Sequence, residues 1–257
     1  MTGTEILALT LSAMAAGAIN AVAGGGTLLT FPALLSFGVP GVIANATSTV
    51  ALVVGTGGSV FGFRRLLPAI RHWLWRFLPV SLAGGWLGSA LLTRTKPEIF
   101  ENSVPFLILF ATVLFMVQGV VRRLPLRVPH AGAPPPRVWP SIIFQFFVAL
   151  YGGYFGAGIG ILMLASFGFI GMHDIHEMNA LKNVLGSLIN VVAALVFLLS
   201  PGLVDWPRAA VMAAGALAGY YLGSHYSQKI PQPVVRRLIT VIGLFAFALT
   251  AWRQFGG

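Results

Sequence analysis

The sequence predicts an all-α polytopic membrane protein, and three observations carry that prediction. Of the 257 residues, 57% are hydrophobic and only 9% are charged, whereas about a quarter of a soluble domain is charged. A soluble globule of this size cannot hide so much apolar surface, so the expected solvent is lipid. Long apolar runs recur along the whole chain, and two glycine-rich breaks interrupt them.

Eight apolar runs are long enough to cross about 30 Å of hydrocarbon, which takes about 20 residues. They cover residues 4–23, 41–63, 73–93, 103–121, 138–157, 178–200, 207–225 and 234–252. Two shorter runs, 27–38 and 159–172, each follow a glycine cluster. The first run lacks the positive start of a signal peptide, so we expect it to be retained as a membrane segment.

A basic, proline-rich stretch at 122–137 divides the chain and reads as an extended cytoplasmic linker between two transmembrane repeats, 1–121 and 138–257. A shift of 134 residues relates the two halves, because it pairs Gly24 with Gly158, Gly26 with Gly160 and Asn45 with Asn179. Each repeat is expected to hold about four long helices and a short broken helix after its glycine cluster. Internal repeats of this kind are typical of transporters.

The distribution of basic residues bears on how the two repeats are oriented. If the basic regions 64–76, 122–137 and 229–237 are all cytoplasmic, each half crosses the membrane an odd number of times and the repeats are inverted. If the short pieces re-enter and return to the same side, the repeats are parallel. The positive-inside rule favours the inverted arrangement.

Glycines at four-residue spacing mark two helices for close packing. They are Gly84 and Gly88 in the third long run and Gly215, Gly219 and Gly223 in the seventh. Small residues at this spacing let helix backbones approach closely. We therefore interpret these glycines as packing positions and not as part of a site.

The glycine breaks predict a central anion site. Broken helices survive in hydrocarbon only where they are buried in protein or line a wet cavity. The short helix after each break presents free N–H groups and the positive end of its dipole. The backbone candidates for this site are Gly24, Gly25, Gly26, Gly158 and Gly160. The alternative is that these glycines only permit close helix crossing.

Polar residues beside the breaks supply the candidate side chains. Fifteen of the sixteen Lys and Arg residues lie in loops or near the ends of the runs, and Lys182 is the exception. Basic residues within a membrane span usually face a cavity. The alternative is that Lys182 lies near the helix end and reaches the membrane surface. The candidate hydrogen-bond donors are Asn45, Thr47, Ser48, Asn179 and Asn183, with Asn20 and its repeat counterpart Tyr154 as further candidates.

Several classes of function are excluded or disfavoured. All six acidic residues lie at the ends of the apolar runs, which argues against a buried proton relay or a cation cage. Asp174 and Glu177 precede an apolar helix as a capping box, which we favour over a metal site. We attribute the net charge of +10 to basic residues in the loops between membrane segments. We expect no nucleic-acid partner, cofactor or metal.

The sequence resembles the sulfite exporter TauE/SafE family, also called the toluene sulfonate uptake permease group. The similar stretches are 21–52 (AVAGGGTLLTFPALLSFGVPGVIANATSTVAL), 178–197 (MNALKNVLGSLINVVAALVF) and 203–231. The resemblance implies a multi-pass permease of the inner membrane for sulfite, sulfonates, sulfoacetate or related organic anions. Many family members keep a glycine cluster in the second half, whereas this chain has Gly156-Ala157-Gly158-Ile159-Gly160 there.

The leading hypothesis is a secondary transporter that binds a small anion near the midplane and works by alternating access. A passive anion channel of the same architecture is the alternative. A membrane enzyme or assembly subunit would need a catalytic set or a polar partner surface, and the sequence has neither. The oligomeric state is left open, with a homodimer among the alternatives.

Overall fold

The structure is a computed structural model that describes residues 1–22, 25–62, 64–121, 138–172, 174–226 and 232–255. These residues form ten α-helices and one short 3-10 helix, η1, with no strand among them. The elements are α1 (Gly3–Val22), α2 (Thr27–Ser36), α3 (Gly41–Gly62), η1 (Arg64–Leu66), α4 (Leu67–Arg94), α5 (Pro97–Val121), α6 (Trp139–Tyr154), α7 (Ile159–Phe169), α8 (Ile175–Leu198), α9 (Trp206–Tyr226) and α10 (Gln232–Phe255). The predicted linker at 122–137 lies outside the described residues.

The eight long helices and two short helices coincide with the predicted apolar runs, apart from shifts at their ends. Helix α4 begins at Leu67 rather than at residue 73, and α5 begins at Pro97 rather than at 103. Proline fits the first turn of a helix because its missing N–H has no partner there. Polar and charged residues in these first turns lower the local hydropathy, so apolar runs alone underestimate the two helices.

The start of α8 is capped as predicted. The Oδ1 atom of Asp174 accepts hydrogen bonds from the backbone N–H groups of His176 at 2.7 Å and Glu177 at 3.3 Å. These bonds satisfy two of the N–H groups that a helix start leaves without partners. Asp174 therefore acts as a helix cap.

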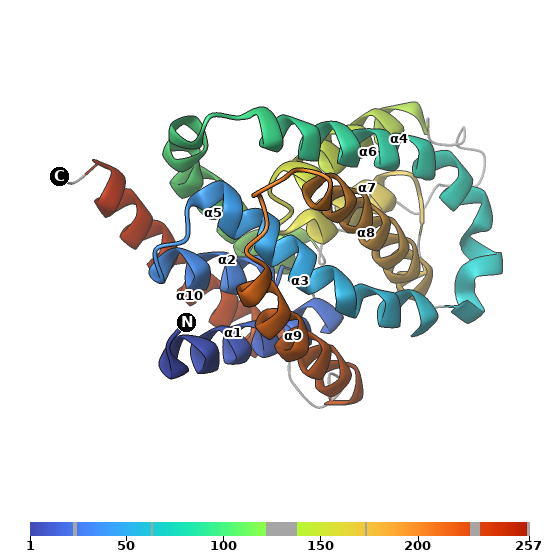
Figure 1. Cartoon of the computed structure of the whole chain (residues 1–257). Coiled ribbons are helices and arrows are strands. Elements are labelled where there is room, and N and C mark those ends of the chain that lie inside the picture. The colour runs from blue at the N-terminus through green and yellow to red at the C-terminus, as the bar shows by residue number, and fades with distance from the viewer. Residues whose placement is uncertain (23–24, 63, 122–137, 173, 227–231, 256–257) are drawn as a thin grey trace, which may run out of the picture.

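The glycine-spaced helices pack backbone to backbone, which confirms their predicted role. Helix α9 lies against α1 (Figure 1), with contacts of Gly215 to Thr10, Gly219 to Met14 and Gly223 to Ala18. Because both residue numbers rise together, α1 and α9 run in the same direction. A Cβ added at any of these three glycines would overlap the backbone of α1.

Helices α4 and α6 form a second parallel pair of the same kind. A Cβ at Gly84 would lie 2.6 Å from the carbonyl oxygen of Phe146, and a Cβ at Gly88 would overlap Leu150. Inside this pair, the amide of Gln145 donates a 2.9 Å hydrogen bond to the hydroxyl of Ser81. Helices α3 and α8 pack against each other, as do α5 and α10.

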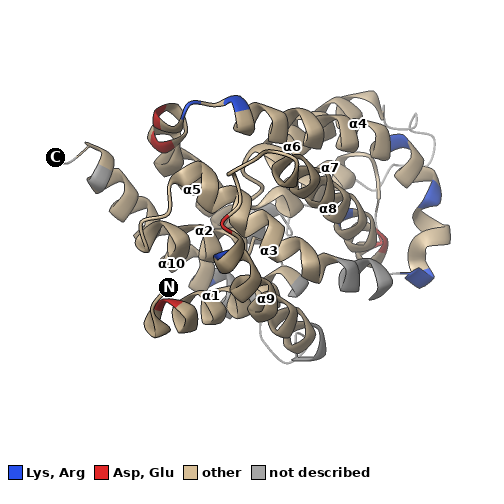
Figure 2. Cartoon of the chain, in the orientation of Figure 1, with Lys and Arg blue, Asp and Glu red and all other residues tan. Residues whose placement is uncertain are grey.

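The molecule has two ends, which we name by a residue at each. The Glu5 end, on the left in Figure 1, holds the first turns of α1, α3, α5 and α9 and the last turns of α4, α8 and α10. The Arg71 end, on the right, holds η1 and the first turns of α4 and α8. Figure 2 shows that the described Lys and Arg residues of the 64–76 region gather at the Arg71 end, whereas both basic and acidic residues lie at the Glu5 end.

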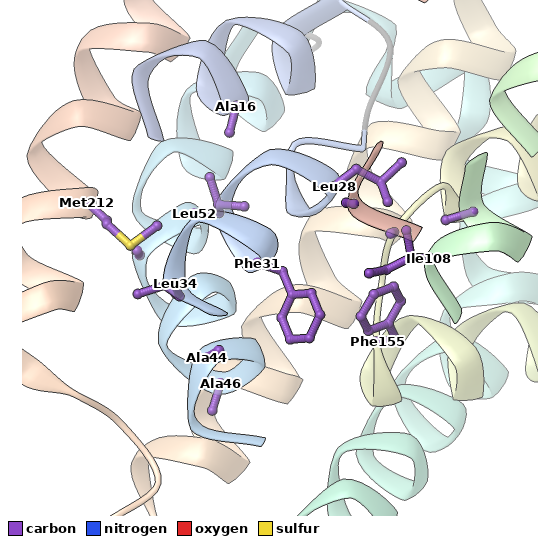
Figure 3. Close-up of a cluster of buried hydrophobic side chains, with 14 of the residues drawn as sticks. Ala16, Leu28, Phe31, Leu34, Ala44, Ala46, Leu52, Ile108, Phe155 and Met212 are labelled. Carbon is purple, nitrogen blue, oxygen red and sulfur yellow. The ribbon is translucent and has the colours of Figure 1, made fainter. Parts of the chain in front are cut away.

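A hydrophobic core surrounds α2 on the side of the Glu5 end. Phe31 of α2 has no exposed surface and lies edge-on to Phe155, with ring centroids 5.3 Å apart. Figure 3 shows this pair together with Leu28, Leu34 and Ile108. Buried residues of α1, α2, α3, α5, α9 and α10 belong to this cluster.

The outer surface is apolar while several polar groups are buried, the opposite of a soluble protein. Large aromatic side chains near the helix ends are exposed, including Trp75, Trp139, Trp206 and Trp252, as in the aromatic belts of membrane proteins. Among the described residues, hydropathy and length mark two helical segments as suited to cross a membrane, Pro97–Val117 and Ile175–Leu198.

Candidate functional site

Three glycines with positive φ mark the predicted helix breaks. Gly25, between α1 and α2, has φ +103°, and Gly156 and Gly158, just before α7, have φ +83° and +80°. L-residues rarely adopt this region, so glycine is the residue that fits. A Cβ on Gly25 would also overlap the ring of Phe115. Both breaks thus depend on glycine for conformation, and the first break depends on it for space as well.

A pocket of about 80 Å³ lies where the two breaks meet the helices α3 and α8. Its lining comes from both halves of the chain. It consists of Asn20, Gly25, Thr27, Thr49, Leu52, Thr56, Phe155, Gly156, Ile159, Gly160, Met163, Lys182, Asn183, Gly186, Ser187, Asn190 and Tyr220. The first residues of both short helices, Thr27 and Ile159, are among them.

Five of the predicted site residues line this pocket: Asn20, Gly25, Gly160, Lys182 and Asn183. Lys182 is only 6% exposed, so its ammonium group stays inside the bundle and does not reach the membrane surface. Its Nζ atom donates a 3.3 Å hydrogen bond to Oδ1 of Asn179. A Cβ added to Gly160 would lie 3.1 Å from Lys182 Cδ, so the glycine makes room for the lysine.

Asn20 holds the first break together from inside the pocket. Its Oδ1 atom accepts a 2.7 Å hydrogen bond from the backbone N–H of Gly26. The N–H of Gly26, which the sequence suggested as an anion contact, is therefore satisfied within the protein. Gly24 lies outside the described residues.

Three predicted donors at the start of α3 lie outside the pocket lining and bond to neighbouring elements. The Nδ2 atom of Asn45 donates a 2.8 Å hydrogen bond to the carbonyl oxygen of Tyr154. The hydroxyl of Thr47 accepts from the backbone N–H of Asp205 at 3.0 Å. Ser48 pairs with the hydroxyl of Thr30 at 2.6 Å. All three are buried and tie α3 to other parts of the structure.

The remaining predicted residues frame the pocket without lining it. Asn179 donates from Nδ2 to the carbonyl of Ile175 at 2.8 Å. Gly158 is the N-cap of α7. The ring of Tyr154 packs against Phe100, with centroids 5.7 Å apart.

Six polar lining residues were not among the sequence candidates: Thr27, Thr49, Thr56, Ser187, Asn190 and Tyr220. A signal for most of the α3 and α8 lining was nevertheless present. The 134-residue shift pairs Thr49 with Asn183, Leu52 with Gly186 and Thr56 with Asn190. Steps of three and four residues place each set on one helix face. The 134-residue correspondence, taken together with helical periodicity, is therefore the signal that predicts these α3 and α8 lining positions.

The charges and dipoles around the pocket favour an anion. Lys182 supplies a positive charge, and no carboxylate is among the described residues that line the pocket. The N-terminal ends of α2 and α7 add the positive ends of two helix dipoles. Amide and hydroxyl groups complete the lining with neutral hydrogen-bond partners. Within the described residues, no cluster of three or more His, Cys, Asp or Glu side chains gathers as metal ligands do.

Aromatic rings pack beside the pocket on the side of the Glu5 end. Phe31 of α2 lies edge-on to Phe100 of α5, and Phe100 contacts Tyr154. Phe155, which lines the pocket, completes the group on its inner side. We call Phe31, Phe100, Tyr154 and Phe155 the aromatic seal.

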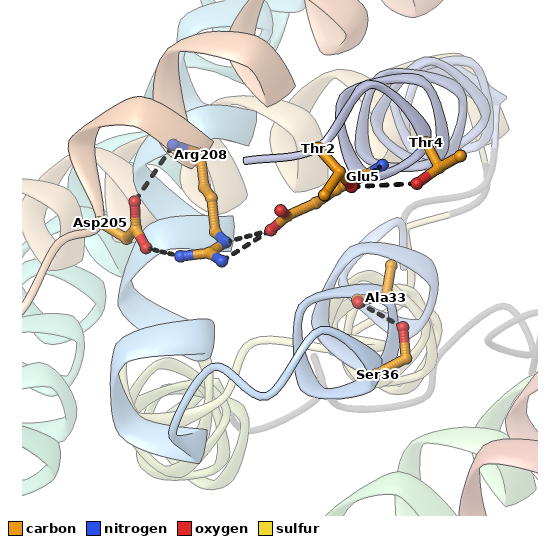
Figure 4. A network of polar contacts seen from close by, with 7 residues as sticks. All are labelled: Thr2, Thr4, Glu5, Ala33, Ser36, Asp205 and Arg208. Carbon is orange, nitrogen blue, oxygen red and sulfur yellow. Dashed lines mark hydrogen bonds and ion pairs between the residues drawn. The ribbon is translucent and has the colours of Figure 1, made fainter.

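A polar network lies beyond the aromatic seal at the same end of the molecule (Figure 4). The guanidinium of Arg208 donates to Glu5 through Nε at 2.7 Å and forms an ion pair with it through Nη2 at 2.6 Å. Arg208 also pairs with Asp205, whose backbone N–H bonds Thr47. The network joins α1, α3 and α9.

Comparisons with known proteins identify the family. The family model described as sulfite exporter TauE/SafE matches residues 9–250. The chain belongs to the sulfite exporter TauE/SafE family. No solved structure matches it.

Curated relatives of this TauE/SafE chain are similar over nearly their full lengths. A probable membrane transporter protein of Haemophilus influenzae is 28% identical, over 98% of this chain and 97% of its own. The probable membrane transporter protein ORF9 of a Sinorhizobium species is 27% identical, over 92% and 88%. The probable membrane transporter protein YfcA of Escherichia coli K12 is 24% identical, over 95% and 88%.

Membership of the TauE/SafE family makes the chain a multi-pass membrane transporter and not an enzyme. The apolar exposed surface and the buried polar side chains agree with that assignment. A transporter of this family moves a small substrate, and both halves of the chain line the pocket between the two breaks.

Proposed function

We propose that the chain is a secondary transporter that moves small sulfur-containing or organic anions, such as sulfite, sulfonates or sulfoacetate, by alternating access. The observation that carries this proposal is the pocket between the glycine breaks, which contains the buried ammonium of Lys182 and, among its described lining, no carboxylate. A buried charge is costly in a membrane protein and usually marks a substrate path.

The lining residues have distinct roles in the proposed site. Lys182 supplies the charge, and the side-chain amides of Asn183 and Asn190 supply hydrogen bonds to the anion from α8. Thr49 and Thr56 line the α3 side of the site, and their hydroxyls donate to carbonyl groups of their own helix. Asn20 and Gly25 hold the first break in position. The predicted residues outside the lining, including Asn45, Thr47, Ser48 and Asn179, support the helices from which these groups project.

We further propose that residues 1–121 and 138–257 are inverted repeats. The pairing of helices supports this arrangement. In the proposed correspondence, α1 of the first repeat matches α6 of the second, and α4 of the first matches α9 of the second. The parallel pair α1–α9 is then equivalent to the parallel pair α6–α4, and both pairs are observed. The start of α3 and the end of α8 lie near the same loop, because Thr47 bonds Asp205, so these corresponding helices run in opposite directions.

The charge distribution supports an orientation for these repeats. The exposed residues Arg64, Arg65, Arg71 and Arg76 lie at the Arg71 end, and basic loops face the cytoplasm. The Glu5 end then faces away from the cytoplasm and is closed by the aromatic seal. On this proposal, the structure corresponds to a state whose pocket is reached from the cytoplasmic side.

Transport by purified protein in proteoliposomes tests the proposal against a channel. A labelled small anion is supplied outside, with a gradient of protons, sodium or a second anion. The proposal predicts accumulation above the external concentration, saturation with substrate and loss of transport in Lys182→Met. Flux that only dissipates the anion gradient would instead support a passive channel. The absence of flux for every anion tested would contradict both.

A further inference from the structure

Two asparagines at equivalent repeat positions make different hydrogen bonds in this structure. Asn45 and Asn179 are 134 residues apart, as are Asn20 and Tyr154. Asn45 reaches across the molecule to the carbonyl oxygen of Tyr154, at the end of α6. Asn179 instead bonds to the carbonyl of Ile175, four residues earlier in its own helix.

The long-range bond of Asn45 lies at the closed end of the pocket. Tyr154 belongs to the aromatic seal, and its ring contacts Phe100. The bond therefore holds the start of α3 against the last residue of α6 where the seal forms. Asn45 is 1% exposed, so the bond is shielded from solvent.

We infer that Asn45 and Asn179 are positioning residues that exchange roles during the transport cycle. This inference rests on the proposed inverted repeats, because such repeats reach the second state by exchanging their conformations. When the Arg71 end closes, Asn179 donates to the carbonyl oxygen of Asn20, the counterpart of Tyr154. Asn45 then releases Tyr154 and bonds within its own helix, to the carbonyl of Gly41.

A second detail of Asn45 fits this exchange. In the part of the chain that the structure describes, its Oδ1 atom is buried and has no hydrogen-bond partner. The corresponding Oδ1 of Asn179 accepts from Lys182, and the counterpart of Lys182 is Ser48. In the exchanged state, Ser48 is thus placed to donate to Asn45, after leaving Thr30, which it bonds here. Each asparagine has its oxygen satisfied in the state where its amide bonds locally.

Cysteine accessibility tests the inference directly, because the chain has no cysteine of its own. Gly186→Cys provides the reporter, since it lines the pocket and a Cβ there meets open space. The protein is reconstituted in vesicles, and its labelling rate by a membrane-impermeant thiol reagent is measured separately from each face. The variants are Asn45→Ala and Asn179→Ala, each in the reporter background.

The two variants are expected to shift accessibility in opposite directions. Asn45→Ala weakens closure of the Glu5 end, so labelling from that face rises and labelling from the Arg71 face falls. Asn179→Ala is expected to raise labelling from the Arg71 face and to lower labelling from the Glu5 face. One buried hydrogen bond predicts changes of about threefold to tenfold. Gln145→Ala is the matched control, because it removes a buried amide bond within the α4–α6 pair and should leave the ratio of the two rates unchanged.

Shifts in the same direction, or an unchanged ratio in both variants, would overturn the exchange. Asn179 is only half-buried. If Asn45→Ala does not fold, Asn179→Ala therefore still tests the inference by itself. Labelling requires no bound anion or transport, so this result is separate from the test of the proposed function. If the protein transports anions but the two variants show no opposite shifts, the proposed exchange of the asparagines is wrong and the proposed transport function still stands.

Discussion

The aliphatic chain of Lys182 lies directly against Gly160, in the first turn of α7. A Cβ at Gly160 would be 3.1 Å from Lys182 Cδ and 3.6 Å from Cγ. The glycine of α7 thus leaves the space that the charged side chain of α8 occupies. This contact places the ammonium group beside the second helix break.

Enlarging Gly160 should weaken anion binding by displacing Lys182. Gly160→Val adds branched carbons where the lysine chain lies, and we expect the affinity for the anion to fall about tenfold, as for loss of a hydrogen bond to a charged group. Gly186→Ala is the control, because its Cβ meets open space in the same pocket. Titration calorimetry in detergent compares the two. Equal affinities would show that the Gly160 contact does not set the lysine position.

Replacement of Lys182 by methionine should leave the protein as stable as before, or more stable. Burying an ammonium group costs several kcal/mol before its partners compensate, and an apolar side chain of similar size avoids that cost. Thermal unfolding of the purified Lys182→Met variant measures the effect. A large loss of stability would indicate that the lysine is mainly a structural residue.

The ion network at the Glu5 end should stabilise the fold cooperatively. Glu5→Gln leaves the guanidinium of Arg208 with a weaker partner, and we expect a loss of about 1–2 kcal/mol in the free energy of unfolding. The effect is limited because the Arg208 side chain is 24% exposed. A double-mutant cycle with Arg208→Met measures the coupling. Additive losses would mean that the two side chains act independently.

The packing glycines should not tolerate a methyl group. Gly219→Ala would place a Cβ into the backbone of Met14, and we expect a loss of about 1–3 kcal/mol from forcing α1 and α9 apart. Gly186→Ala should instead stabilise α8 by up to about 1 kcal/mol, since alanine is the better helix former. Chemical or thermal unfolding of both variants gives the comparison. A neutral Gly219→Ala would contradict the described packing.

Much of the fold was predictable because its signals are local. Apolar runs locate the helices, and glycine spacing indicates which helices pack closely in pairs. Asp174, a helix N-cap residue, indicates the start of α8. The ends of α4 and α5 were less predictable, since their first turns are polar and extend beyond the apolar runs. The 134-residue shift supplied the correspondence between the halves.

The candidate site was only partly predictable, for a physical reason. A sequence shows which polar residues lie near a break, but not whether they face the pocket or another helix. Asn45 and Thr47 are close in sequence to Thr49, yet they bond to Tyr154 and Asp205 while Thr49 lines the pocket. Those partners are more than 100 residues away, so only the packed structure separates these roles.

Anion binding to purified protein tests the central claim most directly. A panel of sulfite, sulfate, thiosulfate, a sulfonate, sulfoacetate and acetate is titrated into wild type and Lys182→Met, with binding measured by calorimetry and thermal shift. The account predicts that at least one anion binds and stabilises the wild type, and that this binding is lost in a folded Lys182→Met variant. Equal anion binding by both proteins, or no binding by a monodisperse wild type, would contradict the claim that this pocket is an anion site.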